Sequence, residues 1–310
     1  MTGFPPKKTE AANIQTALAL LKNDALFFSP ESEDASVGLQ LGNLVLELRD
    51  PSRASLDAGV EDYRDHRCTP EGGVVIKFLP PEKIPVESLD SFLRESPLYN
   101  SVRVISGEHG LKSGEIAVFR WDFRALIDVR GRTGRAFLIF GDRSSVDAVA
   151  RIATSLFLPQ IDSLLVHGAS FEMDGKAMVL IGPSGSGKST IAEMSGRLIL
   201  SDEISVLTID SDNALSVWGT PFTGALKKSA NVKLPVRRLL LLVKDRETFI
   251  ESTTRFNQLT TFLRNVVYYR QDLEGFDGLT ELAGRMLDLC PVERLHFAKN
   301  GDFLEVLRWS

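Results

Sequence analysis

The sequence predicts an α/β protein, α+β overall, in which a domain with a mixed sheet around a P-loop motif follows a smaller α+β domain. Its 310 residues suffice for about two domains at roughly 150 residues each. The first half contains short β-type runs, and the second contains a strand, a glycine-rich loop and a helix in succession. We therefore expect domains over residues 1–160 and 161–310.

The composition of the sequence excludes several classes of protein. Hydrophobic residues make up 43% of the chain and charged residues 25%, as in globular proteins. The net charge of −5 argues against a nucleic-acid partner, which needs a basic face. The two cysteines, Cys68 and Cys290, exclude a disulfide framework and a four-cysteine zinc site. The longest aliphatic run, Leu239–Val243, is too short to span a bilayer. No apolar export signal follows Lys7 and Lys8. We therefore expect a cytoplasmic protein without a membrane partner.

The first domain combines helical and β-type patterns. A helix is expected over Glu10–Leu26, and another, capped by Ser144 or Ser145, ends before Pro159. The β-type runs are Leu39–Leu48, Gly73–Phe78, Ile116–Trp121, Ala125–Val129 and Ala136–Phe140.

The second domain opens with a predicted hairpin of Ser163–Met173 and Lys176–Ile181. Asp174-Gly175 joins the two strands and is typical of a two-residue type I′ turn. The further elements expected are helices over Ser189–Gly196, Asn257–Tyr269 and Leu279–Leu289, strands over Ile204–Ile209, Ala214–Trp218 and Leu239–Val243, and a last hairpin of Val292–Phe297 with Phe303–Arg308, turning at Asn300-Gly301.

A P-loop motif occupies residues 182–189, between a predicted strand and a predicted helix. Its glycines let successive N–H groups converge on phosphate oxygens, its lysine adds a point charge, and its last hydroxyl can bind Mg²⁺. The expected phosphate-binding residues are Gly182, Ser184, Gly185, Ser186, Gly187, Lys188, Ser189 and Thr190. A chance glycine loop is the alternative, whereas a transporter ATPase is disfavoured because its Leu-Ser-Gly-Gly-Gln signature is missing.

Two aliphatic segments end in acidic residues and could supply metal ligands. One ends at Asp202 and Glu203, thirteen residues after Ser189, which leaves room for a helix and a returning strand. The other ends at Asp245, whose neighbours Lys244 and Arg246 are more typical of a solvated strand end. We therefore expect Ser189, Asp202 and Glu203 to form the metal site; a charged turn is the alternative.

The hairpin turn predicts the position of a histidine. If Asp174 and Gly175 are the two loop residues, then Met173 faces Lys176. Continuing this register places His167 opposite Gly182, at the entrance to the P-loop motif. We therefore interpret His167 as a site residue rather than as an ordinary strand histidine.

Three motifs together resemble the catalytic domain of HPr kinase/phosphorylase, whose core fold is similar to phosphoenolpyruvate carboxykinase. They are Val166-His167-Gly168, the P-loop motif fifteen residues after the histidine, and Ser201-Asp202-Glu203. The resemblance implies ATP and Mg²⁺ as cofactors and a serine hydroxyl of a protein or peptide as the phosphate acceptor. It implies Asp202 as the base, His167 and Lys188 as further catalytic residues, and Ser189 and Glu203, with Asp202, as metal ligands.

The chain departs from this family at one substrate loop. The family's Pro-Val-Arg-Pro-Gly-Arg-Asn loop has no counterpart beyond Arg255-Phe256-Asn257, so the resemblance implies a serine kinase and not a phosphorylase, with Arg255 as a substitute arginine. Two alternatives share the same site: an ATP-binding regulator without catalysis, and a small-molecule kinase or carboxykinase-like enzyme. The sequence also allows a homo-oligomer.

A basic run follows the expected site. Its seven members are Lys227, Lys228, Lys233, Arg237, Arg238, Lys244 and Arg246. Such a run either receives an anionic substrate or is a solvated face.

Overall fold

A computed structural model describes residues 7–27, 35–50, 61–79, 84–88, 102–139, 143–270, 273–298 and 303–309. Contacts along the chain separate it into two compact units. The first comprises residues 1–39, 45–156 and 269–272, and the second comprises residues 40–44, 157–268 and 273–310. Each unit contains a large mixed sheet, so the protein is of the mixed α/β class. In the described ranges no helix is both long and apolar enough to cross a membrane.

An eight-stranded sheet forms the centre of the first unit, in the order β3-β1-β2-β4-β8-β7-β6-β5. Its strands are β1 (Ala35–Leu41), β2 (Leu44–Asp50), β3 (Arg67–Cys68), β4 (Val74–Leu79), β5 (Arg103–Ser106), β6 (Glu115–Arg120), β7 (Phe123–Asp128) and β8 (Thr133–Leu138). The single strand expected over Leu39–Leu48 is wrong, because Gly42 adopts a φ of 67° and separates β1 from β2.

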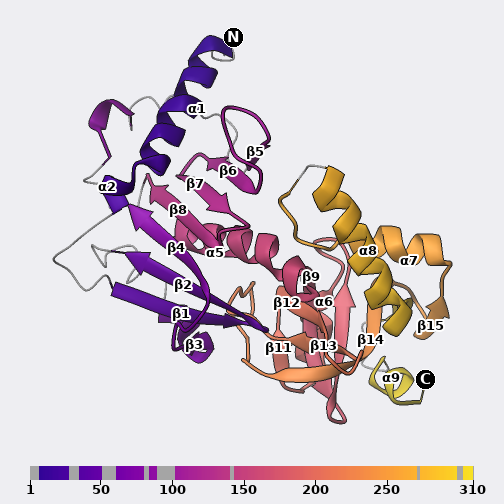
Figure 1. Cartoon of the computed structure of the whole chain (residues 1–310). Coiled ribbons are helices and arrows are strands. Elements are labelled where there is room, and N and C mark those ends of the chain that lie inside the picture. Colours follow the sequence, from indigo (N-terminus) through magenta and orange to yellow (C-terminus); the bar gives the residue numbers. More distant parts are fainter. Residues whose placement is uncertain are drawn as a thin grey trace, which may run out of the picture. The chain divides into compact units, whose positions relative to one another are not determined.

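Helices complete the first unit. The helix α1 (Lys7–Lys22) packs Ile14, Leu18 and Leu21 on the β7–β8 region of the sheet (Figure 1). The further helical segments are α2 (Asp24–Phe27), the 3₁₀ turn Glu61–His66 and α5 (Arg143–Phe157). The 3₁₀ turn Leu158–Ile161 belongs to the second unit. The predicted caps Ser144 and Ser145 are wrong, since both lie inside α5, and the Ser145 hydroxyl donates to Asp122 Oδ2 at 2.6 Å instead.

The second sheet follows the order β10-β9-β12-β13-β14-β16-β15. In addition, β11 pairs with β9, and β10 pairs with β14. Its strands are β9 (Ser163–Met173), β10 (Lys176–Ile181), β11 (Ile199–Ser201), β12 (Ile204–Ile209), β13 (Leu215–Trp218), β14 (Lys233–Lys244), β15 (Phe249–Ser252) and β16 (Val292–Phe297). Its helices are α6 (Lys188–Met194), α7 (Arg255–Leu263), α8 (Leu273–Leu289) and α9 (Phe303–Trp309).

The first hairpin of the second unit follows the predicted register. Met173 pairs with Lys176, and the ladder continues to Gly168 and Ile181. Asp174 and Gly175 both have positive φ, 54° and 76°, as a type I′ turn requires. Local turn chemistry therefore determines which residues of β9 lie beside the end of β10.

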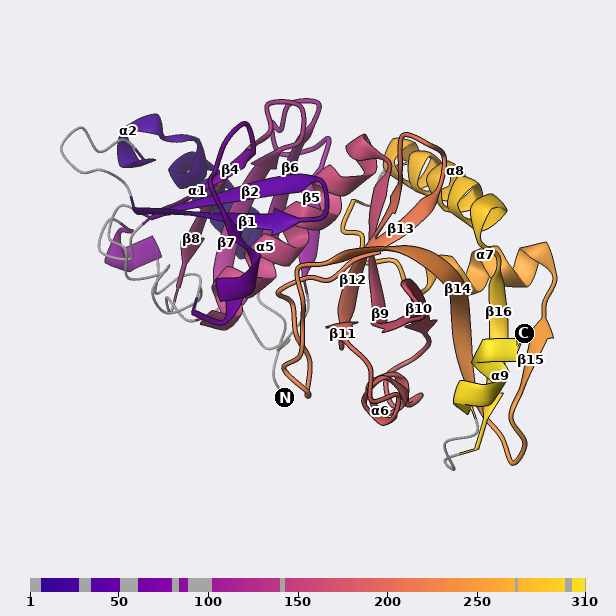
Figure 2. The ribbon, with the colours of Figure 1, turned by 90° about the horizontal axis from the view of Figure 1, so that it is seen from below.

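Three strands of this sheet run parallel: β10, β14 and β16. Their carboxyl ends meet at one edge, where the chain leaves β10 for the P-loop motif. Figure 2 shows α7 and α8 on one side of these strands and α6 on the other, and a separate apolar cluster fills each side. The predicted last hairpin is wrong, because β16 pairs with β14 and β15, and residues 303–309 form α9; the expected turn at Asn300-Gly301 lies outside the described residues.

Candidate functional site

The loop of residues 182–187, hereafter the glycine loop, connects β10 to α6. Gly182, Gly185 and Gly187 have φ values of 142°, 76° and 107°, which side chains with a Cβ rarely adopt. A Cβ on Gly187 would also lie 3.1 Å from the Phe297 ring. The loop therefore needs glycine at all three positions for its backbone angles, and at Gly187 also for close packing against β16.

A cavity of about 300 Å³ opens beside the glycine loop. It brings together residues from β9, the glycine loop, α6, the turn between β11 and β12, and the segment that follows β13. The lining residues are His167, Ser184, Gly185, Gly187, Lys188, Ser189, Thr190, Asp202, Glu203, Gly224 and Ala225. Most of the predicted site residues thus line one cavity; Gly182 and Ser186 lie elsewhere in the same loop.

Lys188 places a buried ammonium group at this cavity, with 7% of the residue exposed. Its Nζ donates to Gly182 O at 2.7 Å and to Pro183 O at 3.1 Å. Burial lowers the pKa of Lys188 from its ordinary value, and the nearby Glu203 carboxylate partly opposes that shift. An anion entering the cavity would stabilise the charged form of this lysine.

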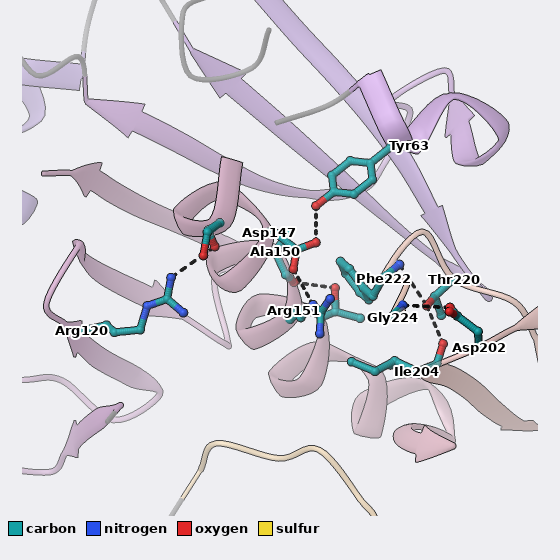
Figure 3. A network of polar contacts seen from close by, with 12 residues as sticks. Tyr63, Arg120, Asp147, Ala150, Arg151, Asp202, Ile204, Thr220, Phe222 and Gly224 are labelled. Atoms are coloured by element: carbon teal, nitrogen blue, oxygen red, sulfur yellow. Dashed lines mark hydrogen bonds and ion pairs between the residues drawn. The ribbon is translucent and has the colours of Figure 1, made fainter. Parts of the chain in front are cut away.

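Asp202 is nearly buried, with 2% of the residue exposed, and it anchors a neighbouring segment. Its Oδ1 accepts from Gly224 N at 2.8 Å (Figure 3). Its Oδ2 accepts from Leu226 N, also at 2.8 Å. Ser189 Oγ donates to the main-chain oxygen of Asp202 at 3.1 Å. The carboxylate therefore has a structural role in holding residues 224–226 at the cavity, a role that the sequence did not reveal.

His167 lies at the cavity, but its backbone does not pair with Gly182 as the register predicted. The β9–β10 ladder ends one residue earlier, at Gly168 and Ile181. Gly182 turns the chain away from the sheet, and His167 N donates to Asn265 O at 2.7 Å. On its other side, His167 pairs with Ile204 of β12.

Asn265 is a site neighbour that sequence reasoning missed. Its Oδ1 accepts from Gly182 N at 3.0 Å, although Asn265 was expected to lie inside a helix over Asn257–Tyr269. That helix is wrong in extent, because α7 ends at Leu263. The polar pair Arg264-Asn265, which interrupts the apolar residues between Phe262 and Val267, was the available signal.

Two further candidates lie apart from the cavity lining. Arg255, the substitute arginine, donates to Gly284 O and pairs with Asp288 on α8 at 2.5 Å. Asp245, the less favoured metal ligand, contacts His296 Nδ1 at 2.9 Å. The histidine hydrogen bond is the main cause that lowers the pKa of Asp245.

The basic run does not form one open basic face. Four of its members make ion pairs, namely Lys228 with Glu193, Lys233 with Asp210, Arg237 with Asp174 and Arg238 with Glu293. Lys244 reaches the glycine loop itself, where its Nζ donates to Gly185 O at 2.8 Å. The structure therefore favours the solvated face over a site for an anionic substrate, since most members pair with acidic side chains. Lys244 is the member that a hydrogen bond places beside the glycine loop.

The oxygen atoms of the cavity fit a hard divalent cation. The Ser189 hydroxyl and the carboxylates of Asp202 and Glu203 line it together, and Mg²⁺ prefers oxygen ligands. No cluster of three or more histidine, cysteine or acidic residues in the described ranges could hold a metal alone. The donor set thus fits Mg²⁺ bound jointly with phosphate oxygens, the usual arrangement for this ion.

Comparisons with known proteins give a structural match alone. No protein-family model matches the sequence, and no curated protein matches it. Among 52 matching solved chains is the Hpr(Ser) kinase/phosphatase from Coxiella burnetii. That match has 15% sequence identity and a TM-score of 0.26, and it covers 46% of this chain and 93% of the other. A similarity at this level carries no inference about activity.

Proposed function

We propose that the second unit is an ATP- and Mg²⁺-dependent kinase that transfers the γ-phosphate to a serine hydroxyl of a protein or peptide. One observation supports this most directly. The cavity combines a glycine loop and a buried lysine with a hydroxyl, two carboxylates and a histidine. These are the group types that phosphoryl transfer uses to position phosphates and to balance their charge.

The loop and its lysine would bind the phosphates. Lys188 Nζ lies against loop carbonyls, so a small rotation of its side chain would exchange these acceptors for phosphate oxygens. In kinases Mg²⁺ bridges phosphate oxygens and neutralises developing charge. Ser189 and Glu203, with Asp202, would hold the ion in this cavity.

Asp202 would accept the proton of the serine hydroxyl. Each of its carboxylate oxygens accepts one backbone hydrogen bond and retains a further acceptor position. His167, on the neighbouring strand, would orient the acceptor or adjust the charge of the site. Positioned acid–base help of this kind contributes about 10²–10⁴-fold to a rate.

A regulator that binds ATP without catalysis is the second candidate, and the anchoring role of Asp202 favours it. A carboxylate that holds residues 224–226 through two backbone N–H groups is explained without any catalytic step. In this reading, ATP would bind at the same loop and no phosphate would be transferred.

The test of nucleotide binding compares two lysine substitutions in the same unit. ATP with Mg²⁺ should raise the melting temperature, because a ligand bound only by the folded state at 100 times its Kd stabilises it by about 2.7 kcal/mol. Lys188→Ala should remove most of the shift, whereas Lys176→Ala, an exposed lysine of the hairpin, should retain it. An equal shift in both variants would overturn the assignment of the phosphate site.

Catalysis is tested by transfer of labelled γ-phosphate into a lysate of the source cell. We expect labelled phosphoserine in a protein or peptide with the wild type and none with Lys188→Ala. ATP binding without transfer or turnover would support the regulator, and label in a small molecule would identify a small-molecule kinase.

A further inference from the structure

The sheet of the second unit divides where β10 ends. Up to Gly168 and Ile181, β9 and β10 pair as antiparallel neighbours. Beyond that point Gly182, with a φ of 142°, directs the chain into the glycine loop. The N–H groups of His167 and Gly182 therefore need other acceptors, because a buried donor without one costs about 1–3 kcal/mol.

One residue satisfies both donors. The main-chain oxygen of Asn265 accepts from His167 N at 2.7 Å, and its Oδ1 accepts from Gly182 N at 3.0 Å. The residue is 8% exposed, and its Nδ2 donates to Thr261 O at 2.8 Å, which fixes the orientation of the amide. The two side-chain contacts use polar atoms that a leucine of similar size lacks, whereas the main-chain contact to His167 does not depend on the side chain.

The backbone around Asn265 takes the place that β10 leaves beside β9. Val266 forms an antiparallel bridge with Val166, and Val267 N donates to Leu165 O at 2.7 Å. Residues 265–267 are thus held to β9 independently of the asparagine side chain. Loss of the side chain alone should leave this short pairing in place.

The same contact leads to the buried lysine. Gly182 donates its N–H to Asn265 Oδ1, and its carbonyl oxygen accepts from Lys188 Nζ at 2.7 Å. The peptide groups on either side of Gly182 are therefore held between the asparagine amide and the lysine ammonium. Rotation of Gly182 would move the acceptor that sets the resting position of Lys188.

We propose that Asn265 is a positioning residue of the nucleotide site, which holds Gly182 and His167 and thereby sets the position of the Lys188 ammonium. The proposal rests on the proposed function for its ligand, the phosphate chain of ATP. It assigns to the segment that follows α7 an influence on phosphate affinity that acts through Gly182 and Lys188.

The test uses a matched pair of buried, apolar replacements in one unit. Asn265→Leu removes the side-chain bond to Gly182, and Thr208→Val removes a 2.9 Å hydroxyl–hydroxyl bond to Ser163 at a distant part of the sheet. We expect affinity for ATP with Mg²⁺, and for inorganic tripolyphosphate, to fall about 10-fold in Asn265→Leu and to be unchanged in Thr208→Val. Urea unfolding of both variants should show that they are folded and have similar free energies of unfolding.

A spectroscopic measurement examines the contact without a nucleotide. In glycine-labelled protein, amide hydrogen exchange at Gly182 should accelerate at least 10-fold in Asn265→Leu. It should stay slow in Thr208→Val, which leaves the Asn265 side chain and its bond to Gly182 in place. If Asn265→Leu fails to fold, Asn265→Ser is measured instead, because its hydroxyl is too short to reach Gly182.

The outcomes separate this proposal from the proposed function. Wild-type protein that binds neither ATP nor tripolyphosphate would defeat both. Wild-type protein that binds them, with Asn265→Leu binding equally well or with Gly182 still protected in that variant, would defeat the role of Asn265 alone. Selective loss of phosphate affinity together with loss of Gly182 protection supports it.

Discussion

The two units treat buried charge in opposite ways. In the first unit Asp122 is fully buried. Its carboxylate accepts two hydrogen bonds from the Arg120 guanidinium, at 2.6 and 2.5 Å, and one from the Ser145 hydroxyl. In the second unit the buried Lys188 ammonium contacts two neutral carbonyl oxygens, and the buried Asp202 carboxylate accepts two backbone N–H groups.

Under the proposed function, this is the difference expected between a charge that is compensated inside the protein and one that remains available to a ligand. A charge removed from water requires compensation, and an internal ion pair that supplies it leaves little attraction for a ligand. The first unit also compensates the Asp147 carboxylate internally, through a hydrogen bond that the Tyr63 hydroxyl donates at 2.5 Å (Figure 3). Lys188 instead borders a cavity, and its Nζ donates to two neutral main-chain oxygens, so an anionic ligand would complete its compensation.

Removal of the internally paired carboxylate should give the largest effect on stability. Asp122→Asn leaves the Arg120 guanidinium without its carboxylate, and breaking a buried pair in this way typically costs 3–5 kcal/mol. Urea unfolding should show that loss, while the ATP affinity of the folded variant should be unchanged. A weakened ATP affinity would show that the nucleotide site of the second unit depends on the first unit.

Asp202→Asn should lower the rate of phosphoryl transfer more than it lowers stability. The amide keeps the size of the side chain, removes the charge that would accept the serine proton, and leaves one of the two backbone N–H groups of residues 224–226 without its acceptor. Phosphoryl transfer should therefore fall about 10²-fold with little change in ATP affinity. Asp210→Asn is the matched control, since Asp210 binds Ser216 and Lys233 instead of the loop that Asp202 anchors. Full transfer activity in Asp202→Asn would eliminate Asp202 as the base.

The buried lysine should make stability depend on pH in the alkaline range. Its pKa is lowered by burial, so between that lowered pKa and the ordinary value of 10.5 the unfolded state binds more protons than the folded state. The unfolding free energy of the wild type, relative to Lys188→Met, should therefore rise with pH across this window, on the order of 1 kcal/mol for each pKa unit of lowering. Saturating tripolyphosphate should reduce the rise, because it stabilises the charged lysine; a rise unaffected by the anion would contradict its place in the phosphate site.

The smallest expected effect is a change in the labelling rate of the two cysteines, one of which lies in each unit. Burial raises the pKa of Cys290 to about 11, and it also raises the pKa of the half-buried Cys68. At pH 8 a thiol reagent should label Cys68 slowly and Cys290 only when the second unit opens. ATP should slow the labelling of Cys290 and leave Cys68 unchanged; equal protection of both would show that the units do not respond separately.

Local signals in the sequence were sufficient for elements whose geometry depends on neighbouring residues. Asp174-Gly175 determines a turn with two positive φ values, and this turn determines the register of β9 and β10. The last segment shows the limit of such reasoning. Phe303 and Leu307 are both fully buried and lie four residues apart, a spacing that forms one face of α9, although the apolar pattern also suited a strand.

The sequence by itself determined the glycine loop and its lysine, because their chemistry follows from residues that are adjacent in the chain. It also identified Ser189, Asp202, Glu203 and His167 as candidates, all of which line one cavity. Only the tertiary structure decided that Asp202 holds residues 224–226 and that Asn265 satisfies Gly182. Those contacts join positions 22, 24 and 83 residues apart, and they arise because backbone N–H groups outside the strand pairings need acceptors, which segments distant in the sequence supply.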